Sequence, residues 1–123
     1  MKRLFVPKNI AQLARDNGFN EVCLAAYGSE NDDNNSFQIW SEDGIDNNSS
    51  SHLAAPLYQQ LIDWFRYKHS IVIWIETAPY VYTFNFRFYI ETYDNRLEGN
   101  KSKDYYKALN EALMEGFKLI KTN

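Results

Sequence analysis

A polar loop in the first half of the chain has the residue types of a calcium site. Asp32, Asn34 and Ser36 occupy alternate positions, as the oxygen ligands of an EF-hand loop do. That loop also needs Gly at its sixth position and Glu at its twelfth, where this chain has Phe37 and Asp43. Because the pattern fails at both diagnostic positions, we interpret the segment as a solvated hairpin loop and expect no bound metal.

A thiol–imidazole pair could be built from Cys23 with His52 or His69. A reactive thiolate needs a positively charged and partly exposed setting. Cys23 instead lies in the apolar run 22–25, where a free cysteine usually serves as a small core residue. His69 is expected to end a helix. These positions favour a structural role over nucleophilic catalysis.

The acidic residues nearest the expected sheet and middle helix are Asp63, Glu76 and Glu91. A carboxylate pair hydrolyses glycosides only at a defined separation, which the sequence does not supply. Glu76 and Glu91 fall near expected strand ends, where solvated charges are normal. The sequence also contains no phosphate-binding Gly-rich loop, no CxxC and no serine elbow. We therefore expect no catalytic residue and no cofactor.

The length of 123 residues, with 45% hydrophobic residues, predicts a single domain over residues 1–123. The only cysteine excludes an internal disulfide framework and fits a reducing compartment. The apolar start of the chain is too short for a signal peptide and ends at Pro7, and no stretch is long enough to span a membrane. We expect a soluble, intracellular protein without a membrane partner.

The charge of the chain is unevenly distributed. The net charge is −3, and residues 16–65 contain nine acids without any Lys or Arg. Nucleic acid binding needs a positive patch, so this charge argues against a nucleic acid partner.

Apolar spacing and turn residues predict the elements that would position these side chains. We expect helices over residues 7–17, 54–69 and 103–121, and strands over residues 21–27, 37–40, 71–75 and 80–93. Ser102 is expected to cap the last helix. The order α-β-β-α-β-β-α predicts an α+β fold, with an antiparallel sheet of about four strands and helices mainly on one face.

The last two strands contain the strongest signal in the sequence. Between positions 80 and 91 the even residues are apolar, which is typical of a half-buried strand. If Ile75 lies opposite Tyr82, the isoleucines at 71, 73 and 75 share the apolar face, whereas a one-residue slip would place them on the polar face. This register puts the turn at residues 77–79 and makes the second strand unusually long, so we expect a bulge within it.

The other face of this hairpin is the best candidate binding surface in the sequence. It would contain an aromatic and polar set, namely Trp74, Thr83, Asn85, Arg87 and Tyr89. Aromatic and arginine side chains are enriched in protein-binding hot spots. Aromatic sheet faces also stack single-stranded nucleic acid bases, but usually with surrounding basic charge. The alternatives are that a helix or the N-terminal segment covers this face, or that the sheet edge or Trp74 forms a homodimer.

Most of the chain outside the polar loops resembles a family of small proteins carried by phages and mobile elements of gut Bacteroides-type bacteria. The resemblance rests on the segments Asn9–Ala14, Gly18–Cys23, Ala55–Arg66 and Tyr106–Leu113, with a strand beginning at Ile71 and a closing Ile120-Lys121. These motifs are structural, and the family contributes no catalytic residues.

The resemblance implies a phage- or prophage-derived accessory protein. With the candidate surface, it predicts a non-enzymatic protein-interaction module whose partner is a host or phage protein. A nucleic-acid-binding accessory factor is the alternative, and a small hydrolase is a third class.

Overall fold

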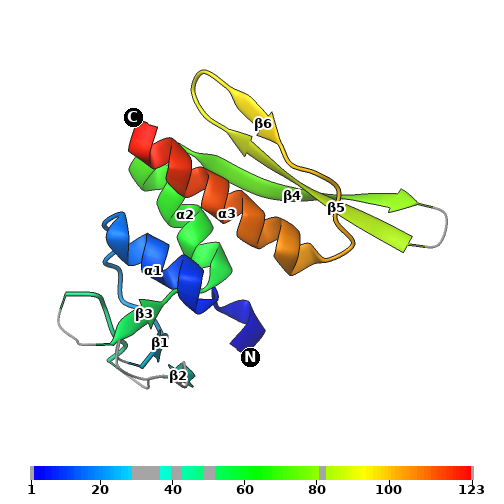
Figure 1. Ribbon diagram of the computed structural model, residues 1–123. Helices are drawn as coiled ribbons and strands as arrows, with labels where there is room; N and C mark the ends of the chain where they lie inside the picture. Colours follow the sequence, from blue (N-terminus) through cyan, green and yellow to red (C-terminus); the bar gives the residue numbers. More distant parts are fainter. Residues whose placement is uncertain (1, 29–36, 40–42, 49–51, 81–82, 123) are drawn as a thin grey trace. The chain divides into compact units, whose positions relative to one another are not determined.

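Figure 1 shows the computed structural model, which describes residues 2–28, 37–39, 43–48, 52–80 and 83–122. Within these ranges the chain forms three α-helices, one short 3-10 helix and six strands in two antiparallel three-stranded sheets. The protein is therefore α+β, as the sequence predicts, although the strands form two sheets of three and not one sheet of about four. The chain divides into two compact units, Met1–Leu61 and Ile62–Asn123.

The first unit contains η1 (Lys2–Leu4), α1 (Lys8–Asp16), β1 (Ala25–Tyr27), β2 (Phe37–Ile39) and β3 (Leu53–Ala55). Its sheet has the order β2-β1-β3, and the central strand β1 is fully buried. Helix α1 buries Ile10, Ala11 and Ala14 on one face, as their spacing predicts. It ends before Gly18, whose φ of 90° lies in the left-handed region that glycine adopts without strain.

Strand β3 corrects a predicted helix start. Its residues pair with β1, and α2 (Tyr58–His69) begins at Tyr58 and not near Ala54. A residue that precedes proline is driven toward extended backbone, so Ala55 before Pro56 suits a strand better than a first helical turn. The side chain of Asn47 accepts a hydrogen bond from the N–H of Ala54 at 3.0 Å, which satisfies a backbone donor of the strand.

The second unit contains the rest of α2, the strands β4 (Val72–Tyr80), β5 (Thr83–Glu91) and β6 (Arg96–Glu98), and α3 (Tyr105–Thr122). Its sheet has the order β4-β5-β6. A Cβ atom on Gly116 of α3 would lie 3.1 Å from both Ile73 of β4 and the Phe65 ring of α2. The Phe65 and Phe117 rings also lie 4.9 Å apart. The two helices therefore form one core with the face of the sheet that carries Ile73 (Figure 1).

The hairpin of β4 and β5 confirms the predicted faces but not the predicted pairing. Ile73 and Ile75 pair with Ile90 and Phe88, so the isoleucines do share a face with even-numbered residues of β5. Ile75 nevertheless lies opposite Phe88 and not Tyr82, which itself falls outside the described residues.

The predicted turn and the predicted bulge are also wrong. Residues 77–79 lie within β4. Pro79 is compatible with this position because β4 is an edge strand, in which a proline does not remove a hydrogen bond of the sheet. The pairing between β4 and β5 runs without interruption from Val72↔Glu91 to Tyr80↔Thr83, so no bulge is present. The strand that was expected to run to residue 93 is nine residues long and ends at Glu91, which removes the need for a bend.

The residue that caps the start of α3 differs from the predicted one. Ser102 exchanges two backbone hydrogen bonds with Phe86, at 2.8 and 2.7 Å, so its backbone still belongs to the sheet side of the connection. The helix cap is instead Asp104, whose carboxylate accepts hydrogen bonds from the N–H groups of Tyr106 and Lys107 at 2.9 and 3.2 Å.

Candidate functional site

Of the five predicted outer residues of the hairpin, Trp74, Arg87 and Tyr89 lie together in the structure, whereas Asn85 and Thr83 lie further along the strand pair. Trp74 and Tyr89 lie directly opposite each other, and Arg87 lies opposite Glu76. Asn85 pairs with Ala78 further along the same face, and Thr83 belongs to the pair that closes the described part of the hairpin. The register differs from the predicted one by an even number of residues, which leaves Trp74, Arg87 and Tyr89 on the face expected for them.

An aromatic stack with a cation above it occupies the middle of this face. The Trp74 and Tyr89 rings are 5.4 Å apart and inclined by only 16°. The guanidinium of Arg96, in β6, lies 5.5 Å from the Trp74 ring and 5.0 Å from the Tyr89 ring. The Trp74 indole N–H donates to a carboxylate oxygen of Glu76 at 3.1 Å. The cation–π contacts and this hydrogen bond hold the rings in one orientation.

A second arginine, Arg87, links β5 to β6. Arg87 of β5 donates from its guanidinium to the Glu98 carboxylate of β6 at 3.2 Å. Its Nε atom is buried and has no hydrogen-bond partner among the described residues. A small cavity of about 60 Å³ lies beside it, with Asn85 and Lys101 in its lining. The guanidinium is thus oriented but retains a free donor.

We call the surface formed by these side chains the outer face, and its residues are Trp74, Glu76, Arg87, Tyr89, Arg96 and Glu98. The helices of the second unit lie on the opposite side of the sheet, where Gly116 of α3 approaches Ile73. None of the described helices of that unit covers the outer face.

Three residues of the outer face, Glu76, Arg96 and Glu98, were missing from the predicted surface, and Glu76 was named only as an acid near a strand end. Arg96 and Glu98 belong to β6, a strand of three residues that carries no extended periodic signal. The only local indication was their alternation around Leu97, which pairs with the buried Ile90. Such a short alternation occurs in many loops and does not predict a strand by itself.

Cys23 has the environment of a structural cysteine. It is 1% exposed, and its backbone exchanges two hydrogen bonds with Ile45. Burial, followed by the negative charges of Glu21 and Asp46, raises the pKa of the thiol to about 12. The thiol is therefore protonated at neutral pH and is a poor nucleophile.

The histidines lie in different units, His52 in the first and His69 in the second. The His69 ring stands edge-on against Trp64, with ring centres 4.7 Å apart. Burial, together with the charge of Lys68, lowers the pKa of His69, so this ring is neutral at physiological pH.

The remaining candidate ligands do not converge. Asp63 lies 3.9 Å from Arg66 on the surface of α2, and Glu76 and Glu91 are exposed. The predicted calcium ligands at 32, 34 and 36 lie outside the described residues. In the part of the chain that the structure describes, no group of three His, Cys, Asp or Glu side chains could hold a metal ion.

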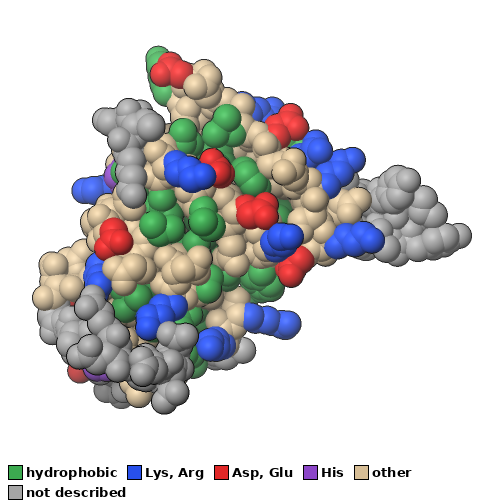
Figure 2. Space-filling view, viewed as in Figure 1, with side chains coloured by type: hydrophobic (Ala, Val, Ile, Leu, Met, Phe, Trp, Pro, Cys, Tyr) green, Lys and Arg blue, Asp and Glu red, His purple; other side chains and the backbone are tan. Residues whose placement is uncertain are grey.

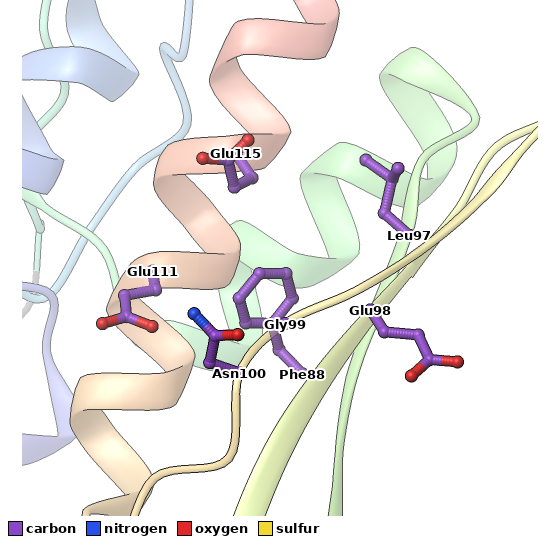
Figure 3. Close-up of a pocket in the computed structure, with 7 residues that line it drawn as sticks. All are labelled: Phe88, Leu97, Glu98, Gly99, Asn100, Glu111 and Glu115. Carbon is purple, nitrogen blue, oxygen red and sulfur yellow. The ribbon is translucent and has the colours of Figure 1, made fainter.

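A cavity of about 320 Å³ in the second unit lies between the segment after β6 and helix α3 (Figure 3). Phe88, Leu97 and Asn100 line one side, and Glu111 and Glu115 line the other. Glu98, which also borders the cavity, points away from it in Figure 3. Glu115 is paired with Lys118 at 3.0 Å. The described lining offers the carboxylates of Glu111 and Glu115 but no Ser, Cys or His side chain.

Comparisons with protein-family models, with curated proteins and with solved structures find no match to this chain. Across the described residues, no helix combines the length and the apolar character that crossing a membrane requires.

Proposed function

We propose that this protein is a non-enzymatic protein-interaction module and that its partner protein binds the outer face. The observation that carries the proposal is the Trp74–Tyr89 stack beneath Arg96, on a sheet face without a described covering helix in its unit. Tryptophan, tyrosine and arginine dominate the energetics of protein interfaces. Because the side chains are already ordered in the free protein, a partner would bind without paying much of their conformational entropy.

The charges of the outer face favour a protein partner of mixed charge. Arg87 and Arg96 are matched on the same face by Glu76 and Glu98. On the side of the molecule that Figure 2 shows, Lys and Arg side chains likewise lie among Asp and Glu side chains. Such a surface complements groups of both signs, whereas a nucleic acid backbone presents only negative charge.

The resemblance to proteins of phages and mobile elements supports a phage or prophage origin. On that basis the partner would be a host or phage protein, and the module would act in the cytoplasm of the bacterial host. The small hydrolase has no support from the cavities described above.

A capture experiment with matched variants tests the proposal. Tagged wild-type protein is compared with Arg96→Ala and Trp74→Ala in host lysate, and Tyr93→Ala is the control because Tyr93 is an aromatic residue that is 98% exposed outside the outer face. We expect wild type to capture a specific protein, and we expect the captured amount to fall by at least about tenfold with each outer-face variant, as for hot-spot residues. The control should capture as much as wild type. Circular dichroism verifies that each variant is folded. Equal capture by all four proteins would reject the outer face as the binding surface.

A single-stranded nucleic acid is the second candidate partner, and the stacked rings favour it. Antiparallel sheets that bind RNA present aromatic rings on which bases stack, often with an arginine nearby. The two glutamates on the outer face oppose this function, because they repel a phosphate backbone.

A further inference from the structure

The free edge of β4 is a second surface that the proposed function does not use. In the sheet order β4-β5-β6, β4 pairs with β5 alone. No described residue outside β5 forms a backbone hydrogen bond with Val72–Tyr80. Edge strands of this kind are templates for another strand.

The structure shows which backbone groups point to the free edge. On β5, Phe86 exchanges hydrogen bonds with Ser102, and Phe88 accepts one from Gly99, so the even-numbered residues face away from β4. The N–H and C=O groups of a strand alternate sides, so the odd-numbered residues of β5 bond to β4. Their partners are the even-numbered residues of β4. The backbone groups of Ile73, Ile75 and Thr77 therefore point outward.

The two ends of this outward row are closed. Pro79 is the next residue whose backbone points outward, and it has no N–H to donate to a further strand. A proline is tolerated at such a position in an edge strand but not in a central strand. At the other end, the N–H of Ile71 already donates to the carbonyl of Phe65 at 3.1 Å. The open row thus consists of three residues that offer three donors and three acceptors.

Within Ile73, Ile75 and Thr77 themselves no lysine, proline or bulge protects the edge. Proteins protect an edge with charged side chains, especially lysine, with proline, with a bulge or with a very short strand, and in β4 the one proline, Pro79, lies beyond the open row. β4 has nine residues, its pairing with β5 contains no bulge, and its only charged residue is Glu76.

We propose that β4 pairs with β4 of a second copy, antiparallel and centred on Ile75, to form one continuous six-stranded sheet. In this register Ile75 lies opposite Ile75 of the second copy, and Ile73 lies opposite Thr77. All six outward backbone groups of each copy are then satisfied. On the outer face Trp74 lies opposite Glu76 of the second copy, which matches an indole donor with a carboxylate acceptor of the kind it already uses within the chain.

Neighbouring registers are less complementary. Moving the centre to Glu76 would place the two Glu76 carboxylates directly opposite each other, which destabilises a strand pair. Moving the centre to Trp74 would bring Ile71 into the ladder, although its N–H is already used by Phe65.

Proline substitution tests the pairing without removing any bond between β4 and β5. Thr77→Pro deletes one outward N–H, and Thr77→Ala is the control because it keeps that N–H and changes the same exposed side chain. Molar mass is measured by light scattering from micromolar to millimolar protein. We expect wild type and Thr77→Ala to approach twice 14.5 kDa with rising concentration and Thr77→Pro to remain at 14.5 kDa. A wild type that stays monomeric at every concentration would overturn the proposal, as would dimeric Thr77→Pro.

Cysteine cross-linking gives an independent readout if Thr77→Pro fails to fold. In a Cys23→Ala background, Ile75→Cys places the new cysteine of one copy directly opposite that of the other copy. The Cα atoms of such a pair are about 5.5 Å apart, so a disulfide can form. Thr77→Cys places the two cysteines four positions apart along the strand, beyond disulfide reach. We expect cross-linking through position 75 and little through position 77. Equal cross-linking at both positions, or none at either, would contradict the register.

Discussion

Because Gly99 has no Cβ atom, the segment after β6 can lie against the core of the second unit. The N–H of Gly99 donates to the carbonyl of Phe88 at 2.9 Å, and a Cβ atom at this position would overlap the Phe88 ring. Phe88 is buried and pairs with Ile75, so it has little freedom to move away.

We therefore expect Gly99→Ala to destabilise the protein by about 1–3 kcal/mol, the usual cost of overpacking. Urea denaturation measures the free energy of unfolding. The same substitution in a Phe88→Leu background should cost less, because the smaller side chain leaves room for the methyl group. Equal costs in the two backgrounds would show that the ring is not the cause.

Cys23 links a single buried group to the pH dependence of stability. Its folded pKa of about 12 lies above the value near 8.5 of an unfolded cysteine. The unfolded chain therefore loses the thiol proton first as pH rises, and stability that is complete below about pH 8.5 decreases toward pH 12.

We expect the free energy of unfolding to fall by about 2.5 kcal/mol more in wild type than in Cys23→Ala between pH 8 and 10.5, because each pH unit above the unfolded pKa costs about 1.4 kcal/mol. Tyr27, whose pKa burial also raises, contributes equally to both proteins, so their difference isolates the thiol. Chemical denaturation at a series of pH values measures it. Parallel curves for the two proteins would contradict the buried, protonated thiol.

At the scale of elements, α3 depends on a cap that lies two residues after the predicted one. The Asp104 carboxylate satisfies two backbone donors at the helix start and also carries negative charge there, which the helix dipole stabilises.

Asp104→Ala should lower the free energy of unfolding by about 1 kcal/mol, and Asp104→Asn should retain most of it because an amide oxygen also caps. Ser102→Ala is the comparison for the predicted but incorrect cap. Thermal unfolding of the three variants ranks them. A larger loss for Ser102→Ala than for Asp104→Ala would restore the original assignment.

The elements themselves were predictable to different degrees. The three helices follow from apolar spacing over nine or more residues, so their cores were predicted correctly. Strand β3 was missed because its apolar residues run directly into the apolar spacing of α2, and β6 was missed because it lies in a polar segment. The faces of the β4–β5 hairpin were predicted correctly because alternate residues of a strand lie on opposite faces of the sheet. The isoleucines must face the core, and this requirement fixes which face carries the odd-numbered residues of β4.

At the scale of the whole molecule, the charge of the chain bears on the choice between a protein and a nucleic acid partner. The net charge is −3. On the outer face the arginines are accompanied by Glu76 and Glu98 and do not form a patch of one sign.

We expect no binding to a fluorescent single-stranded DNA or RNA oligonucleotide at low salt, measured by anisotropy at protein concentrations up to about 100 μM, a range that covers ordinary non-specific affinities. Trp74→Ala is measured in parallel. Binding that weakens with salt and disappears in Trp74→Ala would transfer the proposed function to the nucleic acid alternative.

The sequence by itself determined the α+β class, the three helices and the placement of Trp74, Arg87 and Tyr89 on one face of the hairpin. Each of these depends on local periodicity, which is written in neighbouring residues. Only the tertiary structure decided that Ile75 lies opposite Phe88, because an antiparallel pair can slip by an even number of residues without turning any side chain to the other face. It also decided that β6 joins the sheet and brings Arg96 over Trp74 and Tyr89, since contacts between strands depend on pairing that no local pattern specifies.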